Sequence, residues 1–206
     1  GEIDLALAPT GLELANMRTQ LVFAAPRTRA AELLLFEGIP EFGAITGRCD
    51  VRSQMGDPSI ENIVIQIKDP KGIQARLSGR IDKFPLADRP NTGYDLDVSG
   101  QATKTAVVVQ RLGMEVPALG PLDLTFKIEG STQALQLNGI KLAAGVEDGI
   151  RIGAQGLIWF GDWDQVDPFK TIDLKLQAQS HTTHALGTFI GQELPELGTL
   201  RGEARL

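Results

Sequence analysis

The chain repeats itself with a period of about 77 residues, and no other feature of its sequence constrains the fold as strongly. Pro40, Pro117 and Pro195 lie 77 and 78 residues apart, and each is followed three positions later by a glycine. Self-similarity at such a period indicates a supersecondary unit that buries its apolar side chains only by stacking on its neighbours. We therefore expect an elongated repeat protein, built from three copies of one unit across 206 residues.

Most of each unit alternates between apolar and polar residues. After Pro117 the alternating segment is 122–128, and comparable segments span 45–51, 63–67, 73–81, 94–98, 135–140, 150–158, 172–176 and 200–206. Because successive side chains of a strand point to opposite faces, this period predicts half-buried strands. Segment 63–67 of one copy is aligned here with segment 135–140 of the next.

A different period precedes each proline. Apolar residues recur at every fourth position, as at Val108, Leu112 and Val116 in the second copy. This spacing predicts one short amphipathic helix per unit, since residues four apart share a helix face. We expect the helices to begin at N-capping threonines and to end at left-handed glycines, for which the sequence provides Thr28, Thr105, Thr183, Gly113 and Gly191.

The predicted unit is therefore strand, helix, strand, strand, strand. We expect residues 1–19 to end a preceding repeat, 20–93 and 94–170 to form repeats 1 and 2, and 171–206 to begin repeat 3 of a longer protein. The predicted fold class is mainly β with short helices, the units being stacked into an elongated antiparallel sheet. Periodicity alone favours a filled β-sandwich, in which the apolar faces close on each other. The alternative is a curled sheet whose apolar face forms an open groove that suits acyl chains.

Composition and motifs exclude several function classes. A net charge of −6 and the lack of a basic stripe exclude nucleic acid as the partner, because phosphate binding needs a basic surface. No nucleophile elbow and no glycine-rich phosphate loop occurs, so we expect neither an enzyme nor a cofactor site. His181 and His184, the only histidines, have no third ligand at a metal-site spacing. The only cysteine, Cys49, lies on an apolar strand face and is expected to be a buried small hydrophobe.

Aromatic residues gather at one strand end, at Trp159, Phe160 and Trp163. Packing against the next unit is the expected role of such a cluster, and a lip that contacts lipid is the alternative. The connecting residues 161–168 lack the sixth-position glycine and the closing glutamate of a calcium loop, so we expect a polar connection between repeats.

Two segments carry a resemblance to a known family. Residues 111–120 (RLGMEVPALG) and 189–202 (FIGQELPELGTLRG) share the end of a helix at a glycine and a Pro-x-Leu-Gly turn, and an alternating strand follows each turn. This pattern resembles the repeats of the AsmA-like family of Gram-negative envelope proteins. Residues 77–81 (LSGRI) look like the closing strand of such a repeat. The resemblance covers nearly all of the chain beyond residue 20.

The resemblance implies a fold, a location and a function. Members of the family are anchored in the inner membrane, extend through the periplasm and form a curled β-sheet, or β-taco. Its apolar inner face carries phospholipid between the inner and outer membranes. For this chain the resemblance implies a hydrophobic groove for phospholipid acyl chains and no catalytic residues. It also implies an inner-membrane anchor outside the given residues and an outer-membrane protein as a further partner. It favours the open groove over the sandwich.

The lipid-facing residues that follow are the apolar strand positions Ile45, Val51, Ile65, Ile73, Leu77, Leu96, Val98, Leu122, Leu124, Phe126, Ile128, Ile150, Ile152, Ile158, Leu174 and Leu176. The alternative function is a non-conducting β-sandwich scaffold that assists outer-membrane protein assembly by pairing or docking. Whether these aliphatic positions are accessible to solvent or ligand distinguishes the two.

Overall fold

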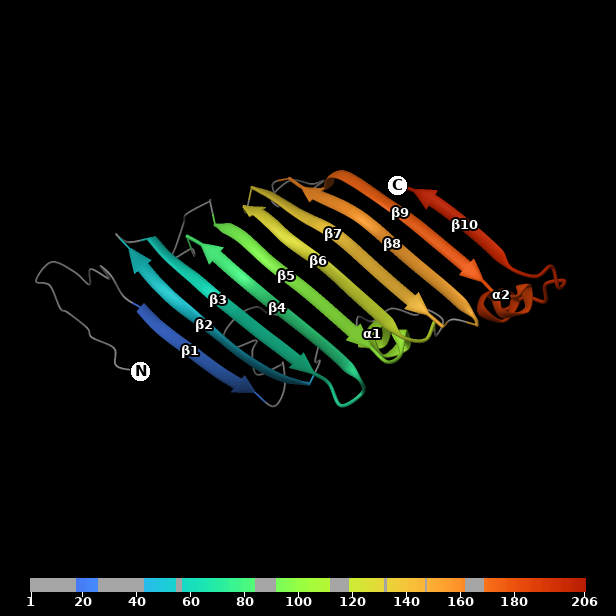
Figure 1. Ribbon diagram of the computed structural model, residues 1–206, viewed down its shortest axis with the longest axis horizontal. Coiled ribbons are helices and arrows are strands. Elements are labelled where there is room, and N and C mark those ends of the chain that lie inside the picture. The colour runs from blue at the N-terminus through green and yellow to red at the C-terminus, as the bar shows by residue number, and fades with distance from the viewer. Residues whose placement is uncertain are drawn as a thin grey trace, which may run out of the picture.

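The structure is a computed structural model that describes residues 18–25, 43–54, 57–83, 92–111, 119–131, 133–146, 148–161 and 169–206. The described residues form a single antiparallel sheet of ten strands in chain order, with β1 and β10 at its edges (Figure 1). The strands are β1 (Arg18–Ala25), β2 (Ala44–Gln54), β3 (Asp57–Lys68), β4 (Ile73–Asp82), β5 (Gly93–Ala102), β6 (Leu122–Ser131), β7 (Ala134–Gly145), β8 (Ile150–Phe160), β9 (Phe169–Ser180) and β10 (Leu200–Arg205). The helices are α1 (Thr105–Arg111), after β5, and α2 (Thr183–Ile190), after β9.

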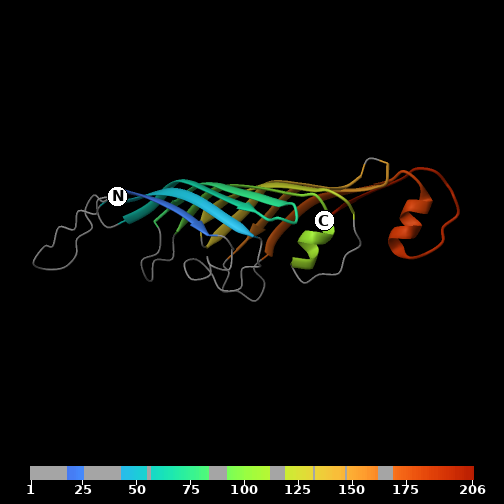
Figure 2. The same cartoon turned by 90° about the horizontal axis from the view of Figure 1, so that it is seen from below.

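The predicted fold class is confirmed at the level of its elements, which are antiparallel strands with two short helices. The filled sandwich is not formed by the described strands, since all of them belong to one sheet. Figure 2 shows that sheet close to edge-on, with both helices on the same side of it.

The pairing register gives the sheet two chemically different faces, because residues paired across an antiparallel ladder point to the same side. One ladder runs through β2 to β10 as Ile45, Ile67, Ala75, Gly100, Leu124, Leu142, Ala154, Leu176 and Ala204. The adjacent ladder is polar, and it consists of Thr46, Gln66, Arg76, Ser99, Thr125, Lys141, Gln155, Lys175 and Arg205. The side of the first ladder is called the apolar face below, and the side of the second the polar face.

Two β-bulges keep the apolar residues of β3 and β7 on one face. The register shifts between Ile60 and Ile63 in β3 and between Leu137 and Ile140 in β7. Each bulge leaves one extra residue of the strand unpaired. Without the bulge, that extra residue would place all the following side chains on the opposite face. The counterparts of Ile60 and Ile63 are therefore Leu137 and Ile140, 77 residues on. This differs from the sequence alignment of segment 63–67 with 135–140.

Glycines allow close approach between neighbouring strands at two matching positions. Gly79 in β4 and Gly156 in β8 have φ of +142° and +150°, a region that side chains rarely adopt. A methyl group on Gly79 would overlap the carbonyl oxygen of Asp95, and one on Gly156 would overlap that of Asp173. Glycine in a strand interior at such a position marks a bend or a close backbone contact.

A buried threonine at the start of each described helix forms a hydrogen bond to the loop that returns from the helix to the sheet. The hydroxyl of Thr183 donates to the carbonyl of Pro195 at 2.6 Å and accepts from the amide of Leu197 at 2.9 Å. Thr105 likewise donates to the carbonyl of Gly120 at 2.8 Å. The prediction of Thr183 as the N-cap is therefore wrong by one position, since the hydroxyl that accepts from the helix amide belongs to Thr182.

The predicted end of α2 is confirmed, because Gly191 caps the helix with a left-handed φ of 71°. Residues 28–39, where the first helix was expected, and Gly113 lie outside the described residues. The loops that return to the sheet also match, since Gly43, Gly120 and Gly198 all have positive φ, of 94°, 96° and 81°.

Gly156→Ala is expected to lower the free energy of unfolding by about 2 kcal/mol or more, because alanine strains this φ and overlaps a neighbouring carbonyl. Gly153→Ala in the same strand is the matched control, since its added methyl would only reach ordinary contact with the carbonyl of Leu142 at 3.6 Å. The control should stay within about 0.5 kcal/mol of the unmodified chain in urea unfolding. Equal losses from the two substitutions would show that close approach at Gly156 does not matter.

Candidate functional site

Every residue that the sequence predicts to face lipid lies on the apolar face. The register brings these side chains together from β2 to β9, although they are spread over 132 positions from Ile45 to Leu176. The same face carries further apolar residues, all but Leu142 within the predicted strand segments, and they are Ile63, Ile67, Ile81, Leu137, Ile140 and Leu142. Their alternation with polar neighbours was visible, but the bulges hid which side they share.

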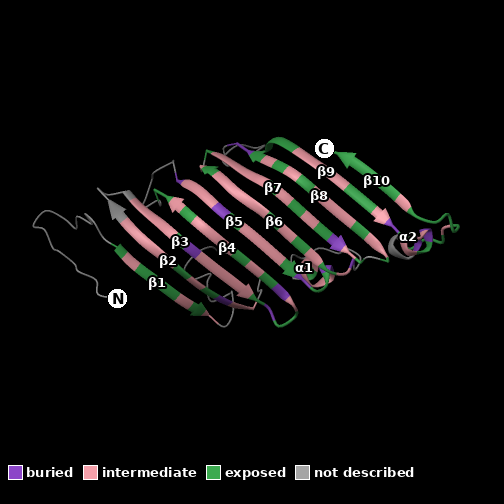
Figure 3. Cartoon of the chain, viewed as in Figure 1, coloured by how far each residue is buried: buried purple, intermediate pink, exposed green. Residues whose placement is uncertain are grey.

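The apolar face is half-buried and is not a closed core. Of the sixteen predicted positions, only Ile45, Ile73 and Leu96 are buried, with 5%, 6% and 5% of their surface exposed, and the others are intermediate. Figure 3 shows intermediate burial over most of the sheet. Because inward side chains in a filled sandwich are largely removed from water, this pattern indicates an apolar surface with room for further contacts.

The apolar face is most deeply buried at the strand ends nearest helix α1. Ile73, Ala102 and Ala144 are buried at the strand ends nearest α1, whereas their polar-face neighbours Gln74 and Gln101 are exposed. The burial is thus confined to one side of the sheet, and α1 follows β5 directly. We infer that the helix lies over this end of the apolar face and shields it from water.

The opposite strand ends of β8 and β9 carry three aromatic residues in two separate contacts, Phe160 with Phe169 and Trp159 with Lys170. The rings of Phe160 and Phe169 are 5.0 Å apart and tilted by 45°, and the Lys170 ammonium lies 5.6 Å from the Trp159 ring. Trp159 and Phe169 keep 37% and 49% of their surface exposed. The packing of Phe160 on Phe169 therefore occurs within one hairpin, while Trp163 lies outside the described residues.

Ion pairs join neighbouring strands on the polar face. The Lys127 ammonium lies 2.9 Å from Asp95 and 2.5 Å from Glu129, and the amide of Asn138 donates to Glu129 at 2.6 Å. Hydrogen bonds from Lys127 lower the pKa of both carboxyls, and the two carboxylates raise the pKa of Lys127. Such exposed, compensated charges are typical of a face in contact with water.

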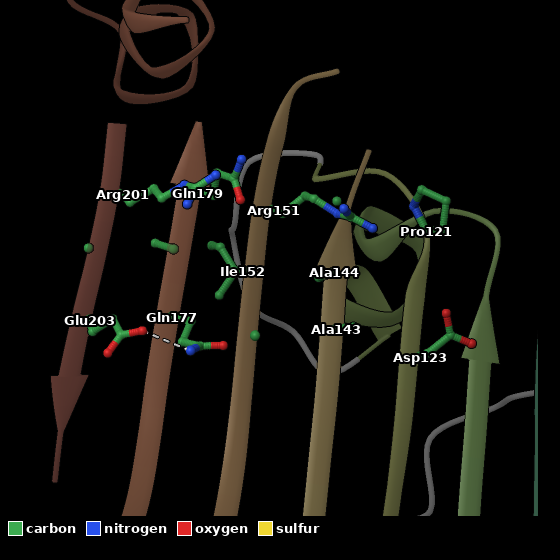
Figure 4. Close-up of a pocket in the computed structure, with 14 residues that line it drawn as sticks. Pro121, Asp123, Ala143, Ala144, Arg151, Ile152, Gln177, Gln179, Arg201 and Glu203 are labelled. Atoms are coloured by element: carbon green, nitrogen blue, oxygen red, sulfur yellow. Dashed lines mark hydrogen bonds between the residues drawn. The ribbon is translucent and has the colours of Figure 1, made fainter. Parts of the chain in front are cut away.

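A hollow of about 520 Å³ lies on the polar face, over β6 to β10 (Figure 4). Its polar lining includes Asp123, Arg151, Gln179, Arg201 and Glu203, and Gln177 donates to Glu203 at 2.9 Å. The small residues Ala143, Gly145 and Gly153 leave the space open. This hollow could not be predicted from the sequence, because its lining residues come together only through the pairing register of five strands. Charges of both signs line it, so it suits water and not an acyl chain.

Cys49 lies on the apolar face and is half-buried, which is less than the sequence led us to expect. Burial, and secondly the negative charge of Asp50, raise the pKa of its thiol, so the thiolate is disfavoured. No group of three or more His, Cys, Asp or Glu side chains within the described ranges is placed to hold a metal ion.

Neither described helix has the length and hydrophobicity needed to cross a membrane. Comparison with known proteins found no matching family model, no matching curated protein and no matching solved structure.

The ion pairs of Lys127 predict an acid-sensitive polar face. Because the folded pKa values of Asp95 and Glu129 are lowered, their stabilisation is full above the unfolded values, near 4, and is lost as pH falls through the folded values. Lys127→Gln should therefore flatten the loss of stability between about pH 6 and about pH 3, measured by urea unfolding. The matched control is Lys141→Gln on the same face, since Lys141 has no ion pair among the described residues. An unchanged pH slope in Lys127→Gln would contradict this assignment.

Proposed function

We propose that this chain is a lipid-binding segment of an AsmA-like protein of the Gram-negative envelope. In this proposal its apolar face binds phospholipid acyl chains in a hydrophobic groove and conducts them between the inner and outer membranes. The observation that carries the proposal is the continuity of the apolar face across the ten described strands, with no second sheet of described residues over it.

A continuous aliphatic surface suits a ligand that has a long apolar body and no fixed length. Each methylene removed from water contributes about 0.8 kcal/mol, so acyl chains would be held by area and not by specific contacts. The ladder through Leu124, Leu142 and Leu176 has no charged member in any described strand, so a chain could slide along it without desolvating a charge.

Curling of the sheet would turn this surface into a groove. Bulges increase the local twist and bend a strand, and strand glycines permit tight bends. Both devices recur at positions 77 residues apart, with bulges in β3 and β7 and with Gly79 and Gly156 in β4 and β8. Their regular placement supports a curvature that is built into each unit, as a β-taco requires.

Matched backbone features support the proposed repeats. Asn62 and Gly139, at the two bulges, both have positive φ, of 51° and 59°, and lie 77 residues apart. Thr105 and Thr183 each donate a hydrogen bond to a carbonyl of the loop that returns to the sheet, although the acceptors, Gly120 and Pro195, are not matching positions. We propose the unit boundaries 20–93, 94–170 and 171–206, with further units and a membrane anchor elsewhere in the protein.

The polar face supports the same orientation, because its compensated ion pairs and charged hollow belong in water. In the envelope this face would meet the periplasm while the opposite face holds lipid. The envelope location is part of the proposal and rests on the resemblance of the sequence to the AsmA-like family.

Leu124→Asp tests the proposal, with Thr125→Asp as its matched control on the opposite face of the same strand. We expect the unmodified chain and the control, purified from a Gram-negative host without detergent, to carry phospholipid in native mass spectrometry. Leu124→Asp should stay folded and bind labelled phospholipid at least about tenfold more weakly, because an acyl chain would desolvate its carboxylate.

Two results would count against this function. A chain that is free of lipid and also fails to take up labelled phospholipid from vesicles would favour the non-conducting scaffold. Global unfolding of Leu124→Asp, with Thr125→Asp still folded, would indicate that the apolar face is a filled core.

A further inference from the structure

The polar face divides along the strands into two halves that differ in charge. One half, called the basic band below, runs from the ladder of Arg76 and Lys141 to the α1 end of the strands. Five cationic strand residues of the band form no ion pair with the described residues, and they are Lys68, Arg76, Lys141, Arg151 and Arg201. The acidic strand residues of the band are Asp123 and Glu203, and Glu203 already lies 3.2 Å from Lys175. The band therefore carries unbalanced positive charge.

The other half of the polar face has the opposite balance. Its acidic residues are Asp50, Glu61, Asp95, Asp97, Glu129 and Asp173. Arg52, Arg80 and Lys127 in this half are each held in an ion pair, at 2.8, 3.5 and 2.9 Å. The net charge of −6 for the whole chain therefore does not describe the basic band.

Two adjoining hollows hold cations of the basic band. The hollow of about 520 Å³ over β6 to β10 is lined by Arg151 and Arg201 (Figure 4). A second hollow of about 350 Å³ over β3 to β6 is lined by Lys68 and Arg76. Asp123 lines both hollows, so they are neighbours on the same face. Most of the unpaired cations belong to the interior strands β3, β4, β7 and β8, so the band does not depend on an edge strand.

We propose that the basic band binds an acidic polypeptide segment, whose carboxylates lie beside Arg76 in one hollow and Arg151 in the other. Guanidinium groups bind carboxylates through two parallel hydrogen bonds. The side-chain amides of Gln74, Gln101 and Gln179 also line the hollows, and an amide can both donate to and accept from a peptide backbone. This site lies on the face opposite the proposed lipid groove and does not rest on that function.

Other anionic partners fit the band less well. Single-stranded nucleic acid is bound by aromatic side chains that stack on its bases, and none of the described strand residues of the band is aromatic. A membrane surface is flat, whereas Arg151 lines a recess in which Ala143 and Gly153 leave space. An extended polypeptide can enter such a recess with its side chains.

The spacing of the two hollows sets the length of the partner. Arg76 and Gln155 lie in one ladder, on β4 and β8, and Arg151 is four residues from Gln155 along β8. With strands about 4.8 Å apart and about 3.4 Å per residue, the backbones at Arg76 and Arg151 are about 23 Å apart. An extended peptide of about seven residues covers this distance, and a compact anion does not.

Fluorescence anisotropy with a labelled octaglutamate peptide tests the proposal at an ionic strength of about 0.1 M. Arg76→Glu and Arg151→Glu should each raise the Kd of the peptide about tenfold or more, because each replaces an anchoring guanidinium by a like charge. The matched control is Arg18→Glu, which makes the same change of charge in the acidic half of the polar face. It should leave the Kd within about twofold, because it lies well beyond the screening length of about 10 Å. All three arginines are exposed, so unaltered circular dichroism spectra are expected.

A change of the opposite sign gives a second test. Asp123 is the unpaired acid between the hollows, so Asp123→Asn should lower the Kd about twofold to fivefold, a direction that damage to the fold would not produce. A peptide that does not bind, or that is weakened equally by Arg18→Glu, would overturn the proposal. Sensitivity to only one of Arg76→Glu and Arg151→Glu would indicate a compact anion site in one hollow. Binding of anionic phospholipid vesicles in place of the peptide would assign the band to a membrane surface, and either of these results also overturns the acidic polypeptide.

Discussion

The rest of this structure depends on one constraint, which is that the alternation of side chains between the two faces stays in phase from strand to strand across the sheet. Each strand alternates its side chains, so one residue of slippage between any two strands would exchange the apolar and polar faces from that point onward. The ladder from Ile45 to Ala204 stays in phase through nine strands. The ion pairs around Lys127 depend on the same phase, since they join β5 and β6 on the other face.

Bulges and glycines keep the apolar side chains on one face while the backbone bends. At the β7 bulge, the backbone at Gly139 takes a positive φ, and the same role falls to Asn62 in β3. Asparagine tolerates this conformation better than most residues because its short side chain bonds locally. Here the amide of Asn62 donates to Asp50 at 2.7 Å, which lowers the pKa of that carboxyl. Equivalent backbone geometry is thus obtained from different residues at two positions that lie 77 residues apart.

Much of this architecture could be predicted from the sequence because it is local. Period-two alternation identified nine of the ten described strands, and Gly191 marked a helix end as expected. Strand β1 was missed, because Leu21, Val22 and Phe23 are consecutive apolar residues that do not alternate. The bulges could not be located from the sequence, because an extra residue is recognised only when the strand is compared with its pairing partner. The residues at the two bulges also differ in type, since one is Asn62 and the other is Gly139. Thr182 and Thr183 are adjacent candidates for one cap, and the choice between them depends on the loop carbonyl of Pro195. The hollow beside Arg151 likewise needed the register of five strands.

Chain-order pairing has a consequence for how such a protein changes length. Every described strand bonds only to the strands before and after it along the chain, so no contact in the sheet depends on residues several units away. The stability of such an array is close to a sum of nearest-neighbour terms. If the proposed 77-residue repeats hold, duplication or loss of one unit would therefore leave all other strand pairs as they were. In that proposed arrangement the length of the sheet could be adjusted by recombination in steps of one unit, without re-optimising an existing interface.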